Sequence, residues 1–174
     1  YYGAITAIHS FFWHSFCDYY LEDVKHRVYQ PETFSAESKK AAQYTLREGL
    51  QTTLKLLAPF APFVTEEIYL NLGFANAEKE KSIHSSPWPT NEEGYINEEA
   101  ENNCTLLHSI LSKVRKHKAE KGLALNEELS SIDITLFEQE AQKIPLIEED
   151  LKATGKIKSV NVKIGKTEEV QVNA

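Results

Sequence analysis

Positively charged side chains are concentrated in one short run of the chain, between residues 113 and 121. The run contains Lys113, Arg115, Lys116, His117, Lys118 and Lys121, with a single carboxylate at Glu120. Such cationic groups pair with phosphate oxygens, and phosphate contacts dominate the affinity of proteins for nucleic acids. The run therefore indicates a phosphate-binding helix, although a solvated helix face would show the same composition.

A helix over residues 98–121 would place these cations on more than one side. At about 100° per residue, Lys113, Lys116 and His117 share one side of the helix. Lys118 points instead towards the apolar stripe of the same helix. The predicted phosphate-binding surface is therefore not one clean face.

A second, smaller cluster lies near the end of the first predicted helix, where Lys25, His26 and Arg27 follow one another. Cations at this place either contact RNA or complement the negative end of the helix dipole. The net charge of the chain is −7. Nucleic-acid binding would therefore depend on local patches and not on the total charge.

The sequence does not group side chains for catalysis or metal binding. Cys17 and Cys104 are the only cysteines, and neither lies in a group of about four ligands at the local spacing that a zinc site needs. Asp18, Glu22 and Asp23 have no nucleophile or metal partner in the pattern. We therefore predict no catalytic residue and no metal site.

Helical segments precede the lysine-rich run. Apolar residues recur every three or four positions over residues 4–29 and again over residues 39–57, which predicts two amphipathic helices. Pro31 is expected to stop the first, and Ser35, or its rival Ser38, to cap the second. The aromatic residues of the first helix, Phe11, Phe12 and Trp13, are expected to fill the core, and the alternative is that they stack on a base.

Two prolines divide the apolar run that follows. Proline suits the first turn of a helix but not its interior, so Pro59 marks a stop and Pro62 a start. We expect a tight corner, then a third helix over residues 64–72 with Gly73 as its cap. Residues 75–97 are polar and charged, and predict a loop.

The spacing of the apolar residues changes after the lysine-rich run. Residues 132–136 alternate as in a strand, residues 138–154 are helical apart from Pro145, and residues 160–172 predict a hairpin. The fold class is therefore predicted as mainly α. A helical bundle would occupy residues 1–126, and a small β-α-β-β appendage residues 127–174.

Four segments, in this order, resemble the anticodon-binding domain of class I aminoacyl-tRNA synthetases. They comprise residues 11–22, the proline corner at residues 56–69, residues 82–89 and residues 114–126. The set is typical of the valyl, isoleucyl and leucyl subgroup, and the last segment is most similar to valyl-tRNA synthetases. The predicted bundle is accordingly identified as an anticodon-binding helical bundle.

The resemblance implies that the chain binds the anticodon arm of tRNA, through the lysine-rich run and through Lys25 and Arg27. It also implies a parent protein whose catalytic domain uses ATP and Mg to activate valine and esterify it to tRNA. The chain starts without methionine on a pattern that is already helical, which indicates a piece of a longer protein. Segments like His-Ile-Gly-His and Lys-Met-Ser-Lys-Ser, which carry the ATP chemistry in that family, are absent. We therefore expect no activity and no cofactor in this chain alone.

Two alternatives remain open. The chain could belong to an isoleucyl or leucyl enzyme, or it could be a helical scaffold that binds protein, which its acidic total charge would favour. No apolar run approaches the roughly 20 residues of a membrane span. We expect a cytoplasmic protein that binds neither membranes nor DNA.

Overall fold

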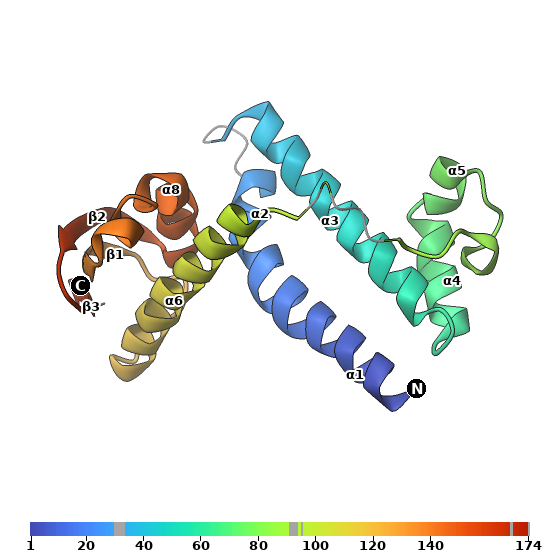
Figure 1. The fold of residues 1–174 in the computed structure, drawn as a ribbon, viewed down its shortest axis with the longest axis horizontal. Helices are drawn as coiled ribbons and strands as arrows, with labels where there is room; N and C mark the ends of the chain where they lie inside the picture. The colour runs from blue at the N-terminus through green and yellow to red at the C-terminus, as the bar shows by residue number, and fades with distance from the viewer. Residues whose placement is uncertain (30–33, 91–93, 95, 168, 174) are drawn as a thin grey trace. The chain divides into compact units, whose positions relative to one another are not determined.

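The computed structural model describes residues 1–29, 34–90, 94, 96–167 and 169–173. The chain divides into two compact units, Tyr1–Glu93 and Gly94–Ala174 (Figure 1). The first is helical, and the second combines helices with a three-stranded sheet, so the fold is mainly α with a small α/β part. This division by contacts falls before the long helix of the lysine-rich run. The domain boundary between residues 126 and 127 stays a prediction.

The first predicted helix is present and includes a stretch of different geometry. Helices α1 (Tyr2–Ser10) and α2 (Glu22–Tyr29) flank a π-helix, Phe11–Leu21. A π-helix closes hydrogen bonds from i to i+5, so spacings of three and four no longer keep side chains on one face. Phe11 and Trp13 are accordingly 47% and 54% exposed, and the expectation that they fill the core was wrong. Pro31 lies outside the described residues.

Helix α3 (Ala36–Leu57) begins where the sequence predicts a cap. The Ser35 hydroxyl oxygen accepts a hydrogen bond from the Ser38 backbone amide at 3.1 Å, so Ser35 and not Ser38 is the N-cap. Helix α3 meets the π-helix at Gly49, where an added Cβ would lie 2.4 Å from the Phe16 ring. The glycine therefore lets the buried phenylalanine pack directly against the α3 backbone.

The proline corner has the predicted form. The Leu57 carbonyl accepts hydrogen bonds from the amides of Phe60, at 2.8 Å, and Ala61, at 2.9 Å, which closes the turn. Helix α4 (Pro62–Asn71) then begins at the second proline, two residues earlier than predicted. Gly73 follows it with a φ of 71°, the left-handed conformation that ends helices and that glycine adopts most easily.

The segment predicted as a loop over residues 75–97 contains two short helical elements. These are α5 (Phe74–Glu78) and the 3₁₀ turn η2 (Ile83–Ser85). Apolar residues from both complete the core of the first unit, which comprises Leu54, Ala58, Tyr69, Phe74 and Ile83. The segment that reads as polar thus contributes Ile83 to this core, and Phe74 lies directly before it.

A carboxylate from the proline corner fixes this segment. The Glu66 side chain accepts hydrogen bonds from the Ile83 amide at 2.9 Å and the Ser82 hydroxyl at 3.0 Å. Ile83 is only 4% exposed, so its amide would have little access to water if the carboxylate were removed. Glu66 therefore joins α4 to the turn η2.

We predict that Glu66→Ala lowers the free energy of unfolding by about 1–3 kcal/mol, because a buried amide would lose its acceptor. The neighbouring variant Glu67→Ala is the control, since the exposed Glu67 carboxylate accepts from the Asn71 side-chain amide one turn later in the same helix. Urea denaturation followed by circular dichroism would compare them. Equal midpoints for the two variants would contradict the role of Glu66.

The second unit consists of a long helix followed by a compact α/β arrangement. Its elements are α6 (Glu98–Glu120), β1 (Leu129–Leu136), α7 (Glu138–Ala141), α8 (Ile144–Gly155), β2 (Ile157–Ile164) and β3 (Glu169–Asn173). The predicted helix over residues 138–154 is split, and α8 has Pro145 in its first turn. Gly122, with a φ of 69°, follows α6.

Strands β2 and β3 do not form the predicted hairpin. The strand order is β2-β1-β3, with β1 parallel to β2 and antiparallel to β3. The central place goes to β1 because its inward residues Ile132, Ile134 and Leu136 are all fully buried. After β2, the Gly165 amide donates to the Leu136 carbonyl at 2.9 Å, which carries the chain across the end of β1.

Helix α6 has its apolar side in the same core as the sheet. It contacts α8 and β3, and α8 contacts β2. Its apolar stripe, Leu107, Leu111 and Val114, is buried in this core. The helix that bears the lysine-rich run is therefore held by the sheet and by α8. None of the helices in the described part of the chain has the length and apolarity for a bilayer crossing.

Candidate nucleic-acid interface

Charge changes sign along α6. Its first turn carries Glu98, Glu99 and Glu101, and the Asn97 side chain caps it by accepting from the Ala100 amide at 3.0 Å. Its last turns carry the cationic run. Both ends complement the helix dipole, so part of this arrangement stabilises the helix itself. The dipole accounts for the order of the charges but not for the number of cations.

The cations of the run differ in exposure. Lys116 and Lys121 are exposed, whereas Lys113, Arg115 and His117 are partly buried. The Lys116 ammonium lies 4.0 Å from the Glu120 carboxylate, and both side chains are mostly in solvent. An exposed pair at this distance contributes little to stability and is easily exchanged. The end of α6 therefore presents cationic groups that an incoming phosphate could contact.

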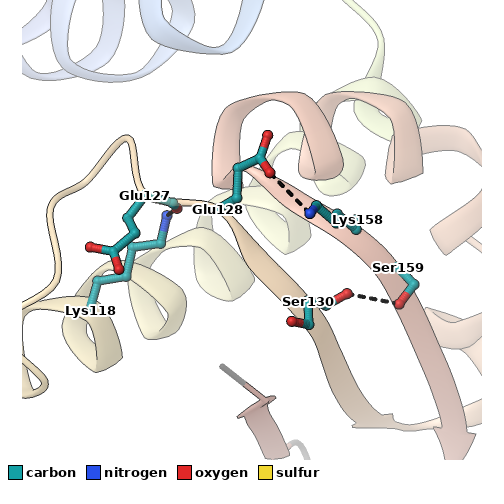
Figure 2. A network of polar contacts seen from close by, with 6 residues as sticks. All are labelled: Lys118, Glu127, Glu128, Ser130, Lys158 and Ser159. Atoms are coloured by element: carbon teal, nitrogen blue, oxygen red, sulfur yellow. Dashed lines mark hydrogen bonds and ion pairs between the residues drawn. The ribbon is translucent and has the colours of Figure 1, made fainter.

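Lys118 is different from the rest of the run. It is 1% exposed, and its ammonium donates to the carbonyls of Leu125 at 3.0 Å, Glu127 at 2.6 Å and Gly155 at 3.0 Å. Figure 2 shows the Lys118 side chain reaching Glu127. An ammonium group has three donors, and all three are used. The prediction that Lys118 contacts phosphate was therefore wrong, although its side chain does point into the apolar stripe.

The environment of the Lys118 ammonium is unusual for a charged group. Burial lowers the pKa of Lys118, while the Glu127 carboxylate acts in the opposite direction and Lys156 adds to the lowering. Three carbonyl dipoles directed at one ammonium stabilise its charged form. A signal for this role was present in the sequence, because Lys118 follows Leu111 and Val114 at the spacing of the apolar stripe.

The turn after α6 is closed by a residue that sequence reasoning did not select. Glu127 uses its carboxylate to accept from the Ala124 amide at 3.2 Å, and its own amide donates to the Ala124 carbonyl at 3.0 Å. The Leu123 amide donates to the Lys118 carbonyl at 2.9 Å. These bonds, together with those of the Lys118 ammonium, give the turn a defined backbone.

The second predicted cluster lies in the first unit and is described by itself. Lys25 is exposed and forms an ion pair with Glu22 one turn earlier. Arg27 is partly buried, and His26 is buried with its ring centroid 4.7 Å from that of Phe34. Lys25 is thus the member of this cluster most open to solvent.

Metal ligands are not assembled in the part of the chain that the structure describes. Within these residues, no three histidine, cysteine or acidic side chains lie close enough to hold a metal ion. Cys17 is partly buried and Cys104 exposed, and the two are not joined in a disulfide. Burial, with a smaller effect of the Asp18 charge, raises the pKa of the Cys17 thiol, so this thiol is less reactive than usual.

Comparison with known proteins extends these observations. A family model described as the anticodon-binding domain of tRNA ligase matches residues 1–134. The chain is 38% identical over 163 residues to the valine–tRNA ligase of Methanopyrus kandleri, covering 93% of this chain and 17% of that protein. It is 42% identical over 132 residues to the valine–tRNA ligase of Methanosarcina barkeri, covering 76% of this chain and 14% of that protein. The chain thus spans less than a fifth of the length of these relatives.

Proposed function

This chain belongs to the family of anticodon-binding domains of tRNA ligases, and we propose that it binds the anticodon arm of a valine tRNA. The proposal is supported most directly by the end of α6, where Arg115, Lys116 and Lys121 stand in or partly in solvent. The family match includes this helix. Cations on a rigid helix suit the phosphates of a folded RNA arm, because phosphate contacts fix the position of the RNA without reading its bases.

We further propose that the parent protein is a valine–tRNA ligase of the cytoplasm. A catalytic domain elsewhere in that parent would activate valine with ATP and Mg and transfer it to the tRNA. The role of this chain would be to hold the anticodon arm so that the acceptor end reaches that domain. The names of the relatives support valine over isoleucine and leucine.

The binding of RNA is tested by its dependence on salt. We expect the 174-residue chain to bind a valine tRNA transcript with an affinity that falls about 20- to 40-fold between 50 and 200 mM salt. This is the decrease for about three neutralised phosphates, each of which releases counterions. Fluorescence anisotropy with the labelled transcript would measure it.

Matched ligands separate the proposal from its alternatives. Isoleucine and leucine tRNA transcripts test the choice of tRNA, and a DNA hairpin with the anticodon-arm sequence tests the preference for RNA. A protein-binding scaffold would bind none of these with a steep salt dependence. Weak binding that does not change with salt would therefore overturn the proposed function.

A further inference from the structure

Residues 121–127, which we call the α6 turn, combine three kinds of side chain at one exposed place. Lys121 and Asn126 are exposed, and Leu125 is 66% exposed. A cation, an amide and an apolar side chain are the groups that contact a phosphate, a base edge and the face of an unstacked base. The backbone that presents them is fixed by the bonds of Glu127 and Lys118 described above.

Core packing does not explain a lysine at position 118. A leucine or methionine there would extend the apolar stripe of α6, and burying an ammonium costs free energy that apolar side chains do not. The ammonium adds hydrogen bonds that an apolar side chain could not form, because it donates to the Leu125 and Glu127 carbonyls on both sides of Asn126. Through Gly155 it also ties the turn to the end of α8.

We propose that the α6 turn is a preformed nucleotide-contact element for a single-stranded part of the tRNA, and that Lys118 is its positioning residue. This rests on the proposed function. Lys118 itself touches no RNA, since its donors are used by the three carbonyls. Leu125 and Asn126 make the contact, and the buried ammonium sets the backbone from which they project.

Neutral substitutions in the turn test the contact. In the 174-residue chain, Leu125→Ala with Asn126→Ala is expected to weaken binding of a valine tRNA transcript about 10-fold, because one hydrogen bond to a base edge and one apolar contact with a base would be lost. The slope of log affinity against log salt should not change, because neither residue is charged. If the wild-type chain binds with the expected salt dependence and this variant binds equally well, the nucleotide contact is wrong while the proposed function stands.

Two adjacent glutamates give a test in which the direction of the change in tRNA affinity distinguishes a loss of turn structure from a change in charge. Glu127→Ala and Glu128→Ala each remove one negative charge, but only Glu127 closes the turn, whereas the Glu128 carboxylate lies 3.1 Å from the Lys158 ammonium (Figure 2). Electrostatics alone would raise tRNA affinity in both variants. We expect Glu127→Ala to weaken binding about 5-fold and Glu128→Ala to leave it unchanged or strengthen it. A gain in affinity for Glu127→Ala would overturn the proposal.

The role of Lys118 is measured by the coupling between its substitution and the substitutions of Leu125 and Asn126 in their effects on tRNA affinity. Lys118→Met is expected to weaken binding about 10-fold, and adding the Leu125 and Asn126 substitutions should cost little more, because the turn is already displaced. If the fold losses in tRNA affinity of the separate variants multiply in the combined variant, the substitutions act independently and Lys118 is not a positioning residue. If Lys118→Met does not fold, the comparison of the two glutamates decides the question. If the wild-type chain binds no tRNA, the proposed function fails, and this inference fails with it.

Discussion

Charge reversal of Arg115, Lys116 and Lys121 to glutamate is expected to weaken tRNA binding on the order of 100-fold at physiological salt. Each charge-assisted contact contributes about 1 kcal/mol or more, and the new carboxylates would also repel phosphate. The salt dependence should become shallower by about one power of the salt concentration for each lost contact. Anisotropy titrations at several salt concentrations would measure both effects.

A matched control separates this local effect from the change in net charge. Lys143, Lys163 and Lys166 lie in the same unit but away from the end of α6. Their triple reversal changes the net charge by the same amount. If the control loses as much affinity as the α6 variant, the cationic end of α6 is not the interface. Circular dichroism would check that both variants keep their helices.

Replacing Lys118 is expected to have the largest effect on stability. Lys118→Met keeps most of the side-chain volume but leaves three carbonyls without their donor, and the Gly155 contact is buried. A buried group that loses its partner costs about 1–3 kcal/mol. Because part of this cost is recovered by water at the more open carbonyls, we expect a loss of about 3 kcal/mol in the free energy of unfolding.

Two lysines of the same helix serve as controls for this measurement. Lys116→Met and Lys121→Met remove exposed ammonium groups, and we expect changes within about 0.5 kcal/mol. Urea denaturation of the three variants, followed by circular dichroism, would rank them. A Lys118→Met chain as stable as the two controls would mean that the ammonium does not hold these segments together.

Local chemistry explains which elements could be predicted from the sequence. The stop at Pro59, the start near Pro62, the Ser35 cap and Gly73 after α4 depend on the backbone preferences of single residues. Such preferences act within a few positions, and each of these features is found in the structure. The mainly α fold with its small appendage follows from the same kind of pattern.

Non-local contacts explain most of what could not be predicted. Strands β2 and β3 are close in sequence, yet each pairs with β1, because the most apolar strand takes the centre of the sheet. Residues 75–97 read as a loop, but Glu66 from another helix fixes part of that segment. For the candidate site, the sequence indicated the cationic helix and placed Lys118 on its apolar stripe. It could not show which carbonyls the Lys118 ammonium binds, since one of them lies 37 residues away.

The packing of α6 has a consequence for deletion mapping. Its apolar side is covered by α8 and the sheet, so a truncation after residue 126 would not simply remove an appendage. It would expose Ile110, Leu111 and Val114 to solvent, and all three are buried in the intact chain. Lost RNA binding in such a truncated protein would report a collapsed helix and not a contribution of the missing strands to recognition. Point substitutions, and not shortened chains, are therefore the way to separate the two.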